Sequence, residues 1–164
     1  FVTDAIDMGV ANTFIAQLLF LENQDPDRDI SVYINSPGGQ AYAGRAMYDT
    51  MKHIKNEIIT INVGLAASAG AMILAGGTKG KRYALPGSYT MIHQTLGGAE
   101  GQASDVEITA NHMVKLKNQY AEIIAKESGQ KLEKVKQDID RDYWMDSSQA
   151  VKYGLIDKIM KSKK

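Results

Sequence analysis

Cysteine is absent from this 164-residue sequence, and so is any long hydrophobic run. The lack of cysteine excludes disulfides, thiolate zinc sites and cysteine nucleophiles, and it fits a reducing compartment, so we expect a cytoplasmic protein. Charged residues interrupt every apolar stretch before the ~20 residues that a membrane helix needs. No signal peptide is visible. We therefore expect no membrane partner.

An excess of either charge is also lacking. Lys and Arg together number 19, as do Asp and Glu, so the formal net charge is zero. Nucleic-acid-binding proteins usually gather a basic surplus on one face, whereas the basic residues here are scattered, apart from a Lys-rich C-terminus. We expect no nucleic-acid partner. No repeat or linker divides the chain, which predicts one globular domain over residues 1–164.

Strand patterns alternate with helix patterns along the chain, which favours an α/β fold with βαβ-type crossovers. Asp7 is expected to cap a first helix, and Asp146, with Gln149 three residues later, to cap the last one. A turn is expected over 35–39. The expected strands cover 30–34, 58–63, 82–85 and 88–92. The other expected helices lie around 46–54, 71–75 and 104–127.

Ser68 differs from the other eight serines in its setting. It follows an expected strand, precedes an apolar helix, and has only Ala or Gly at the four nearest positions. Small neighbours allow a tight strand-to-helix turn that exposes the hydroxyl, as in the serine turn of α/β-hydrolases. The helix N-terminus would favour an oxyanion there. The alternative is that small residues only let the helix pack closely on the sheet.

A serine nucleophile needs a base, and His93 ends an apolar strand where a Gly-rich loop begins. It could equally be a hydrogen-bonded structural residue. His53 and His112 lie in helices with polar neighbours, and we expect no role for them. Among 19 acidic residues, Asp142 is expected to be partly buried, because the aromatic pair Tyr143 and Trp144 follows it.

Two glycine turns need interpretation. Ser36-Pro37-Gly38-Gly39 could present consecutive N–H groups to an oxyanion, or be an ordinary turn. Residues 76–82 resemble a phosphate loop only superficially, because Ala75 stands at the required first Gly and Arg82 replaces the magnesium-binding Ser or Thr. We therefore expect no nucleotide site and no cofactor.

Nine segments, in this order, resemble the proteolytic subunit of the Clp protease, a serine peptidase family with a crotonase-like fold. The match covers nearly the whole chain and includes FIAQLLFLE, YINSPGG, YDTM, GLAASAGAMIL, GKRYALPGS, MIHQ, LGGAEGQASD, DRDYW and AVKYGLID. The resemblance implies an α/β fold of repeated ββα units with a protruding handle helix. It also implies that the family's N-terminal axial segment is absent from residues 1–164.

For the chemistry, the resemblance implies a triad of Ser68 as nucleophile, His93 as base and Asp142 as its orienting partner. The oxyanion donors would be the N–H groups of Gly39 and Ala69. Two departures bear on substrate preference: Ala69 stands where bacterial members usually have Met, and Thr95 replaces the usual Pro after His-Gln.

For assembly, the resemblance implies two stacked seven-membered rings joined through residues 97–104 and the helix after them. Asp140 and Arg141 would make the ring-to-ring contact. A Clp-type AAA+ ATPase would deliver unfolded polypeptides, docking in a cleft formed by strand residues. The residues of this expected cleft are Tyr33, Ile61, Val63, Tyr83 and Leu85.

Two other functions remain open at this point. An acyl-CoA hydratase or isomerase would share the fold and a pair of oxyanion N–H groups, but would use carboxylates instead of the serine–histidine pair. A non-catalytic ring subunit would only complete a mixed assembly, although all three triad positions are retained. A membrane-bound relative with a Ser–Lys dyad is excluded by the missing membrane segment and by His93.

Overall fold

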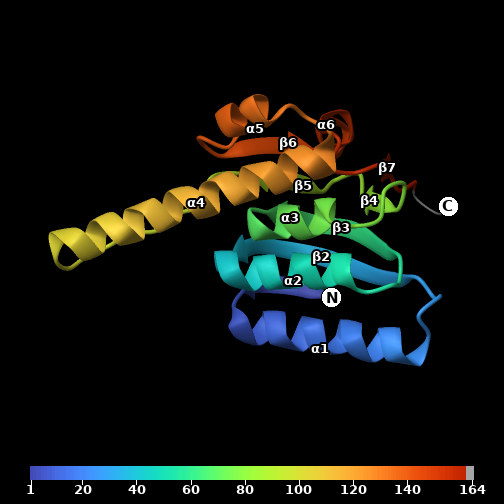
Figure 1. The fold of residues 1–164 in the computed structure, drawn as a ribbon. Helices are drawn as coiled ribbons and strands as arrows, with labels where there is room; N and C mark the ends of the chain where they lie inside the picture. Colours follow the sequence, from blue (N-terminus) through green and yellow to red (C-terminus); the bar gives the residue numbers. More distant parts are fainter. Residues whose placement is uncertain (162–164) are drawn as a thin grey trace.

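The computed structural model describes residues 1–161, so Lys163 and Lys164 of the Lys-rich end lie outside the described residues. The predicted α/β class is confirmed: within residues 1–161 a seven-stranded, mostly parallel sheet is combined with six helices (Figure 1). The strands are β1 (Val2–Ile6), β2 (Ile30–Gly39), β3 (Ile58–Ala67), β4 (Arg82–Ala84), β5 (Tyr89–Ile92), β6 (Tyr143–Asp146) and β7 (Lys158–Ile159). The helices are α1 (Met8–Gln24), α2 (Ala41–His53), α3 (Ala69–Ala75), α4 (Ala103–Ser128), α5 (Leu132–Asp138) and α6 (Ser147–Tyr153).

The sheet is built around β3. Its strand order is β1-β2-β3-β4-β7, and β5 pairs with the end of β3 beyond β4. All of these pairs are parallel, and only β5 and β6 pair antiparallel. The carboxyl ends of β2, β3 and β5 therefore meet at one edge of the sheet, where ligands bind in many open α/β sheets.

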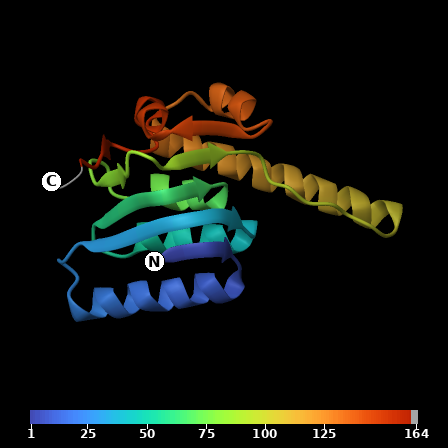
Figure 2. The same ribbon diagram turned by 180° about the vertical axis from the view of Figure 1, so that it is seen from behind.

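The two faces of the sheet differ. Residues of β2 alternate strictly between buried and exposed, although strands of parallel sheets are usually buried on both faces. Buried Val32 and Ile34 pack into the core under the helices, whereas Tyr33 on the other face is 37 % exposed. Figure 2 shows β2 and β3 from that side, with α2 and α3 behind them. One face of the sheet is therefore open around β2.

Local signals predicted the helices well. Asp7 caps α1 by accepting a hydrogen bond from Val10 N at 2.8 Å, and Asp146 and Gln149 form the expected capping box of α6. The turn expected over 35–39 is wrong, because β2 continues to Gly39 and pairs there with β1. The short strands β1, β6 and β7 were not predicted, since each is defined by its pairing partner.

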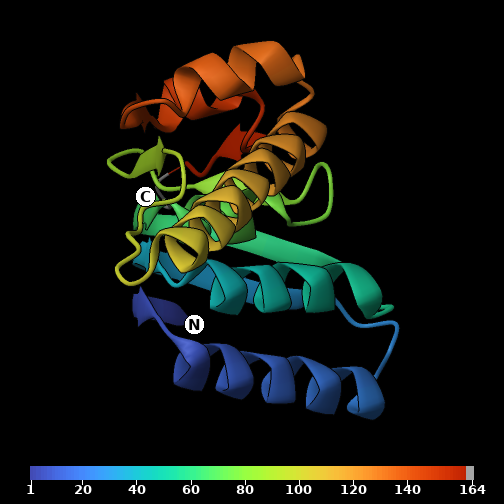
Figure 3. The ribbon, with the colours of Figure 1, turned by 60° about the vertical axis from the view of Figure 1, so that its left-hand side comes forward.

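The longest helix, α4, extends well beyond the rest of the fold (Figure 1). Its C-terminal part is buried against the core through Ala121, Ile123 and Ile124. Its N-terminal part carries exposed apolar residues, with Ile108 68 % and Val114 56 % exposed. Seen from the side, α4 passes over α2 (Figure 3), and two hydrogen bonds join these helices. None of the helices within residues 1–161 is long and apolar enough to cross a membrane.

Candidate active site

Ser68 occupies the turn between β3 and α3 with an unusual backbone conformation. Its φ is 54° and its ψ −118°, and among residues 1–161 only one other non-glycine residue has a positive φ. Such a conformation is costly and persists only where the surroundings fix it. Ser68 N donates to Met91 O at 2.8 Å, and Ser68 O accepts from the N–H groups of Ala71 and Met72. Both ends of the residue are therefore held.

Glycine allows the end of β2 to approach this turn. Gly38 has a φ of 88°, and a Cβ added to it would lie 2.5 Å from Ala67 O and 2.8 Å from Ser68 Cβ. On the helical side, a Cβ on Gly44 of α2 would lie 2.7 Å from the Cβ of Ala69. The small residues around Ser68 thus serve both alternatives raised by the sequence, because they form the tight turn and also allow close helix packing.

His93 and Asp142 are brought together by the only antiparallel strand pair within residues 1–161. His93 directly follows β5, Asp142 directly precedes β6, and their neighbours Ile92 and Tyr143 are paired in register. His93 Nδ1 lies 3.0 Å from Asp142 Oδ1. This contact leaves Nε2 as the free nitrogen of the ring.

The expected burial of Asp142 is wrong. Its side chain is 59 % exposed, whereas that of His93 is 15 % exposed. The aromatic neighbours do not cover it, because Tyr143 is 37 % and Trp144 52 % exposed. Asp142 lies instead at the surface.

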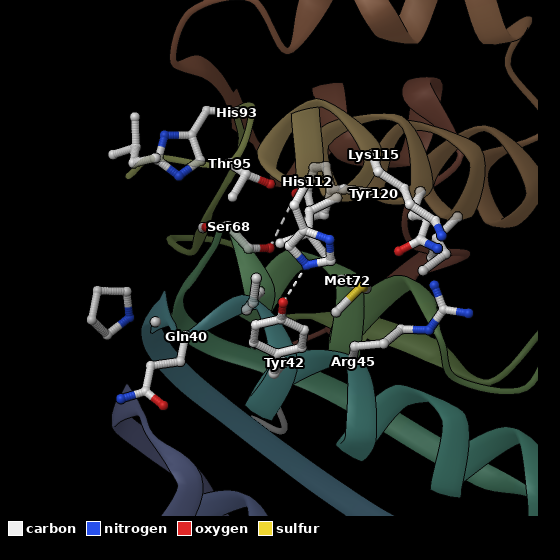
Figure 4. A pocket seen from close by; sticks show the side chains of 18 residues that line it. Gln40, Tyr42, Arg45, Ser68, Met72, His93, Thr95, His112, Lys115 and Tyr120 are labelled. Atoms are coloured by element: carbon white, nitrogen blue, oxygen red, sulfur yellow. Dashed lines mark hydrogen bonds between the residues drawn. The ribbon is translucent and has the colours of Figure 1, made fainter. Parts of the chain in front are cut away.

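Ser68 and His93 line the same cavity of about 550 Å³, between α2, α4 and the carboxyl ends of the strands (Figure 4). Gly39 and Ala69, the two expected oxyanion donors, also line it. Within residues 1–161 no hydrogen bond joins Ser68 to His93; catalytic hydrogen bonds are often long before substrate binds. The N–H of Ala69 is in the first turn of α3, where helix N–H groups lack helical partners.

The walls of the cavity are largely apolar, with cationic groups from two helices. Met72, Leu116 and Ile123 contribute apolar surface, while Arg45 and Lys115 contribute positive charge. No Asp or Glu is among the described residues that line it. Within the same described part of the chain, no group of three or more His, Asp and Glu side chains could hold a metal ion.

No role was predicted from the sequence for two residues that line the cavity. His112, for which no role was expected, lines the cavity, and a hydrogen bond joins its Nε2 to the hydroxyl of Tyr42, whose ring it also stacks on. Tyr120 donates a hydrogen bond to Ser68 O at 3.1 Å. The available signal was their spacing: His112, Leu116, Tyr120 and Ile123 follow one another at helical intervals along α4.

Three of the five residues of the expected docking cleft form one row across three strands. Tyr33 pairs with Ile61 on β3, and Ile61 pairs with Tyr83 on β4. Ile61 is only 6 % exposed, whereas Val63 and Leu85 are 38 % and 37 % exposed. The other expected interface pair, Asp140 and Arg141, is exposed beside the site, and Gln94 Nε2 donates to Asp140 O at 2.9 Å.

This arrangement is that of an α/β protein with a serine and a histidine facing one cavity at the edge of its sheet, as in hydrolases. The family model of the Clp protease matches residues 1–163, so the chain belongs to the Clp protease family. It is a peptidase of the Clp type, and peptides are its class of substrate. The match favours this activity over that of an acyl-CoA hydratase.

Proposed function

We propose that this chain is the proteolytic subunit of a Clp protease, a serine endopeptidase with Ser68, His93 and Asp142 as its triad. The observation that carries the proposal is the 3.0 Å hydrogen bond between His93 Nδ1 and Asp142 Oδ1. It joins segments 49 residues apart, beside the cavity that Ser68 also lines. Neither a metal ion nor a cofactor is needed for this chemistry.

In the proposed mechanism, Asp142 accepts a hydrogen bond from the Nδ1–H of His93, which keeps Nε2 unprotonated. Ser68 Oγ then attacks the carbonyl carbon of the substrate, while His93 Nε2 takes the hydroxyl proton. The resulting oxyanion is stabilised by the N–H groups of Gly39 and Ala69. His93 returns the proton to the leaving amine, and a water molecule, activated in the same way, releases the acyl group from Ser68.

The cavity beside Ser68 is proposed to hold the substrate side chain that precedes the cleaved bond. Its apolar lining favours apolar side chains, and Arg45 and Lys115 disfavour a basic one. Ala69 in place of Met leaves this region with a smaller side chain than the family pattern implies.

A serine-directed fluorophosphonate tests the proposal. We expect one adduct per subunit, mapped to Ser68, and loss of both labelling and peptide cleavage in Ser68→Ala. Loss of a triad member typically lowers kcat by about 10⁴- to 10⁶-fold. Ser148→Ala, which alters an exposed serine of α6, should remain fully active.

The same assay separates the alternatives. Peptide cleavage that survives in Ser68→Ala contradicts the triad. Turnover of an enoyl-CoA without peptide cleavage indicates a hydratase. An unlabelled, inactive wild-type protein that still assembles indicates a non-catalytic ring subunit.

Assembly into two stacked seven-membered rings is part of the proposal. Exposed apolar residues support it, because Leu96, Ile108 and Val114 are each more than half exposed in the single subunit. Such surface usually marks a protein interface. In this arrangement α4 and the preceding loop are the handle between rings, and Asp140 and Arg141 make the contact that covers Asp142.

The partner is proposed to be a Clp-type AAA+ ATPase that delivers unfolded polypeptides to the chamber. The sequence lacks a phosphate loop over residues 76–82, so the energy for unfolding must come from another chain. The open face of the sheet around Tyr33, Val63, Tyr83 and Leu85 is the proposed docking surface. Residues 1–164 then act as one proteolytic domain, and we propose the cytoplasm as its location.

A further inference from the structure

Tyr120 connects α4 directly to the backbone of the candidate nucleophile. Its hydroxyl donates a hydrogen bond to Ser68 O at 3.1 Å, and its ring lines the same cavity (Figure 4). Burial raises the pKa of the Tyr120 hydroxyl far above its ordinary value. The hydroxyl therefore keeps its proton, and can donate, throughout the pH range in which a serine peptidase works.

The other contacts of the Ser68 backbone do not duplicate this one. Ser68 O also accepts from Ala71 N and Met72 N, but these groups belong to the helix that Ser68 itself begins and would move with it. Ser68 N is fixed from outside by Met91 O. Among the described residues, Tyr120 is the only partner from another element that holds the carbonyl end.

The carbonyl that Tyr120 binds shares a peptide unit with an oxyanion donor. Ser68 C=O and Ala69 N–H lie in one plane and point in opposite directions, because the peptide bond is planar and trans. Fixing the carbonyl therefore fixes the direction of the Ala69 N–H. A hydrogen bond to a carbonyl also polarises its amide, which strengthens the N–H as a donor.

We propose that Tyr120 is a positioning residue that aims and strengthens the Ala69 N–H of the oxyanion hole through Ser68 O. This inference rests on the proposed function, in which Ser68 is the nucleophile. Tyr120 itself touches no reacting atom. Its effect should appear where negative charge develops on the substrate oxygen, which happens in the transition state and not in the bound substrate.

The test compares Tyr120→Phe with Tyr48→Phe. Both remove only one hydroxyl, and both remove a hydrogen bond that involves α4, since Tyr48 on α2 donates to Glu127 Oε1 at 2.6 Å. Tyr48 does not line the cavity that holds Ser68. The measurements are kcat and KM for a fluorogenic peptide, together with the dissociation constant of a peptide boronate, which forms a tetrahedral adduct with a serine hydroxyl.

We expect Tyr120→Phe to lower kcat about tenfold with little change in KM, which is less than the ~10²- to 10³-fold cost of removing an oxyanion donor outright. The boronate should bind more weakly by a similar factor. Tyr48→Phe should change none of these three quantities, even if it destabilises the protein. An unchanged kcat in Tyr120→Phe, or equal losses in kcat and peptide affinity, overturns the proposal.

Two further arms keep the outcome interpretable. If Tyr120→Phe does not assemble, 3-fluorotyrosine at position 120 retains the hydroxyl as a stronger donor and should raise kcat modestly; an unchanged kcat then overturns the role. If Ser68→Ala keeps its activity, the triad itself is wrong. If Ser68→Ala is inactive and Tyr120→Phe is normal, only the positioning role is wrong.

Discussion

Arg82 binds Asp157 through two guanidinium nitrogens, with Nε 3.0 Å from Oδ2 and Nη2 2.6 Å from Oδ1. The arginine side chain is only 3 % exposed and that of the aspartate 19 %. Arg82 Nη1 also donates to Glu127 O at the end of α4, at 2.9 Å. The pair thus joins β4, the segment before β7 and the last turn of α4.

Removing one partner of this pair should destabilise the fold. Asp157→Ala leaves the buried Arg82 charge without its carboxylate, a change that typically costs about 3–5 kcal/mol. Asp49→Ala is the matched control, because Arg45 and Asp49 form an exposed pair on α2, and such pairs contribute about 0.3–0.5 kcal/mol. Urea unfolding at one fixed protein concentration measures both. Equal losses of stability in the two variants would contradict the expectation that the buried pair contributes more than the exposed one.

The same ion pair should make the stability of the fold decrease at acid pH. Burial alone would raise the pKa of Asp157, but the hydrogen bonds from Arg82 and from the Gly80 N–H outweigh it and hold the pKa below its usual range. Because the folded pKa is lowered, the stabilisation is present above the ordinary carboxyl value of about 3.9 and is lost as the pH falls through the folded value.

A second prediction tests the assignment of Asp142 as the carboxylate of the proposed triad. Asp142→Asn should leave the fold intact, because the side chain is mostly exposed, but should lower kcat by about 10⁴-fold, since an amide cannot stabilise the imidazolium. Asp146→Asn is the control: it alters the cap of α6, and asparagine is an equally good cap. A fully active Asp142→Asn with an inactive Asp146→Asn would mean that the wrong carboxylate was assigned.

Structure that depends on neighbours in the sequence could be predicted, whereas structure that depends on contacts between distant segments could not. Asp7 and Asp146 specify helix starts through neighbours three residues away, so α1 and α6 were predictable. The extension of β2 to Gly39 depends on pairing with β1, some 33 residues earlier in the chain, and periodicity cannot report such pairing. Ser68 was recognisable from its small neighbours because the strained turn is local.

The pairing of His93 with Asp142 was beyond the reach of residue patterns alone. Asp142 meets His93 only because β5 and β6 pair antiparallel, and the four residues of β6 are too few to show a strand periodicity. The assignment of Asp142 came from family resemblance, and its expected burial was wrong. Tyr120 and His112 were visible as parts of a helical stripe, but a stripe does not reveal which cavity it lines.

The positive charge of Arg45 and Lys115, which line the cavity, should determine part of the substrate preference. Peptides with Leu or Met before the cleaved bond should be cleaved about tenfold faster than those with Lys, because Arg45 and Lys115 repel a basic side chain. Lys115→Glu should reduce this difference. Lys117→Glu makes the same charge change on α4 outside the lining residues and should leave the preference intact. Identical preferences in all three proteins would show that Lys115 does not reach the substrate.

Alkaline pH should destabilise the protein through buried phenols. Burial raises the pKa values of Tyr48, Tyr120 and Tyr153, and hydrogen bonds to Glu127 and Asp138 add to the effect for Tyr48 and Tyr153. The unfolded phenols ionise near the ordinary value of about 10. Their raised folded pKa values mean that stability is fully present below that pH and declines as the pH rises toward the folded values.

Urea midpoints measured between about pH 8 and 11 should therefore fall with pH, the range being set by the ordinary phenol pKa of about 10. Tyr153→Phe should make this decline shallower, since it removes one of the titrating groups. Tyr89→Phe, which changes an exposed residue of β5, should follow the wild type. A decline as steep in Tyr153→Phe as in the wild type would rule out this cause.

The last prediction concerns the row of Tyr33, Ile61 and Tyr83 on the open face of the sheet. The proposed division of labour lets the subunit cleave short peptides without ATP but not a stably folded protein, which needs a cognate Clp ATPase. A tyrosine ring with a polar tip suits a half-exposed docking surface, and Tyr33 already stacks on Phe1. Ile61 is buried within this row, so its substitution would not report on docking alone.

Tyr83→Ala should therefore abolish ATPase-dependent degradation of a folded substrate while short-peptide cleavage stays within about twofold of wild type, as expected for a contact that stabilises only the complex. The control is Tyr89→Ala, which removes an exposed tyrosine outside the row and should retain both activities. If both activities fall together in Tyr83→Ala, the residue supports the sheet instead of binding the ATPase. Digestion of the folded substrate by the subunit alone would contradict the division of labour itself.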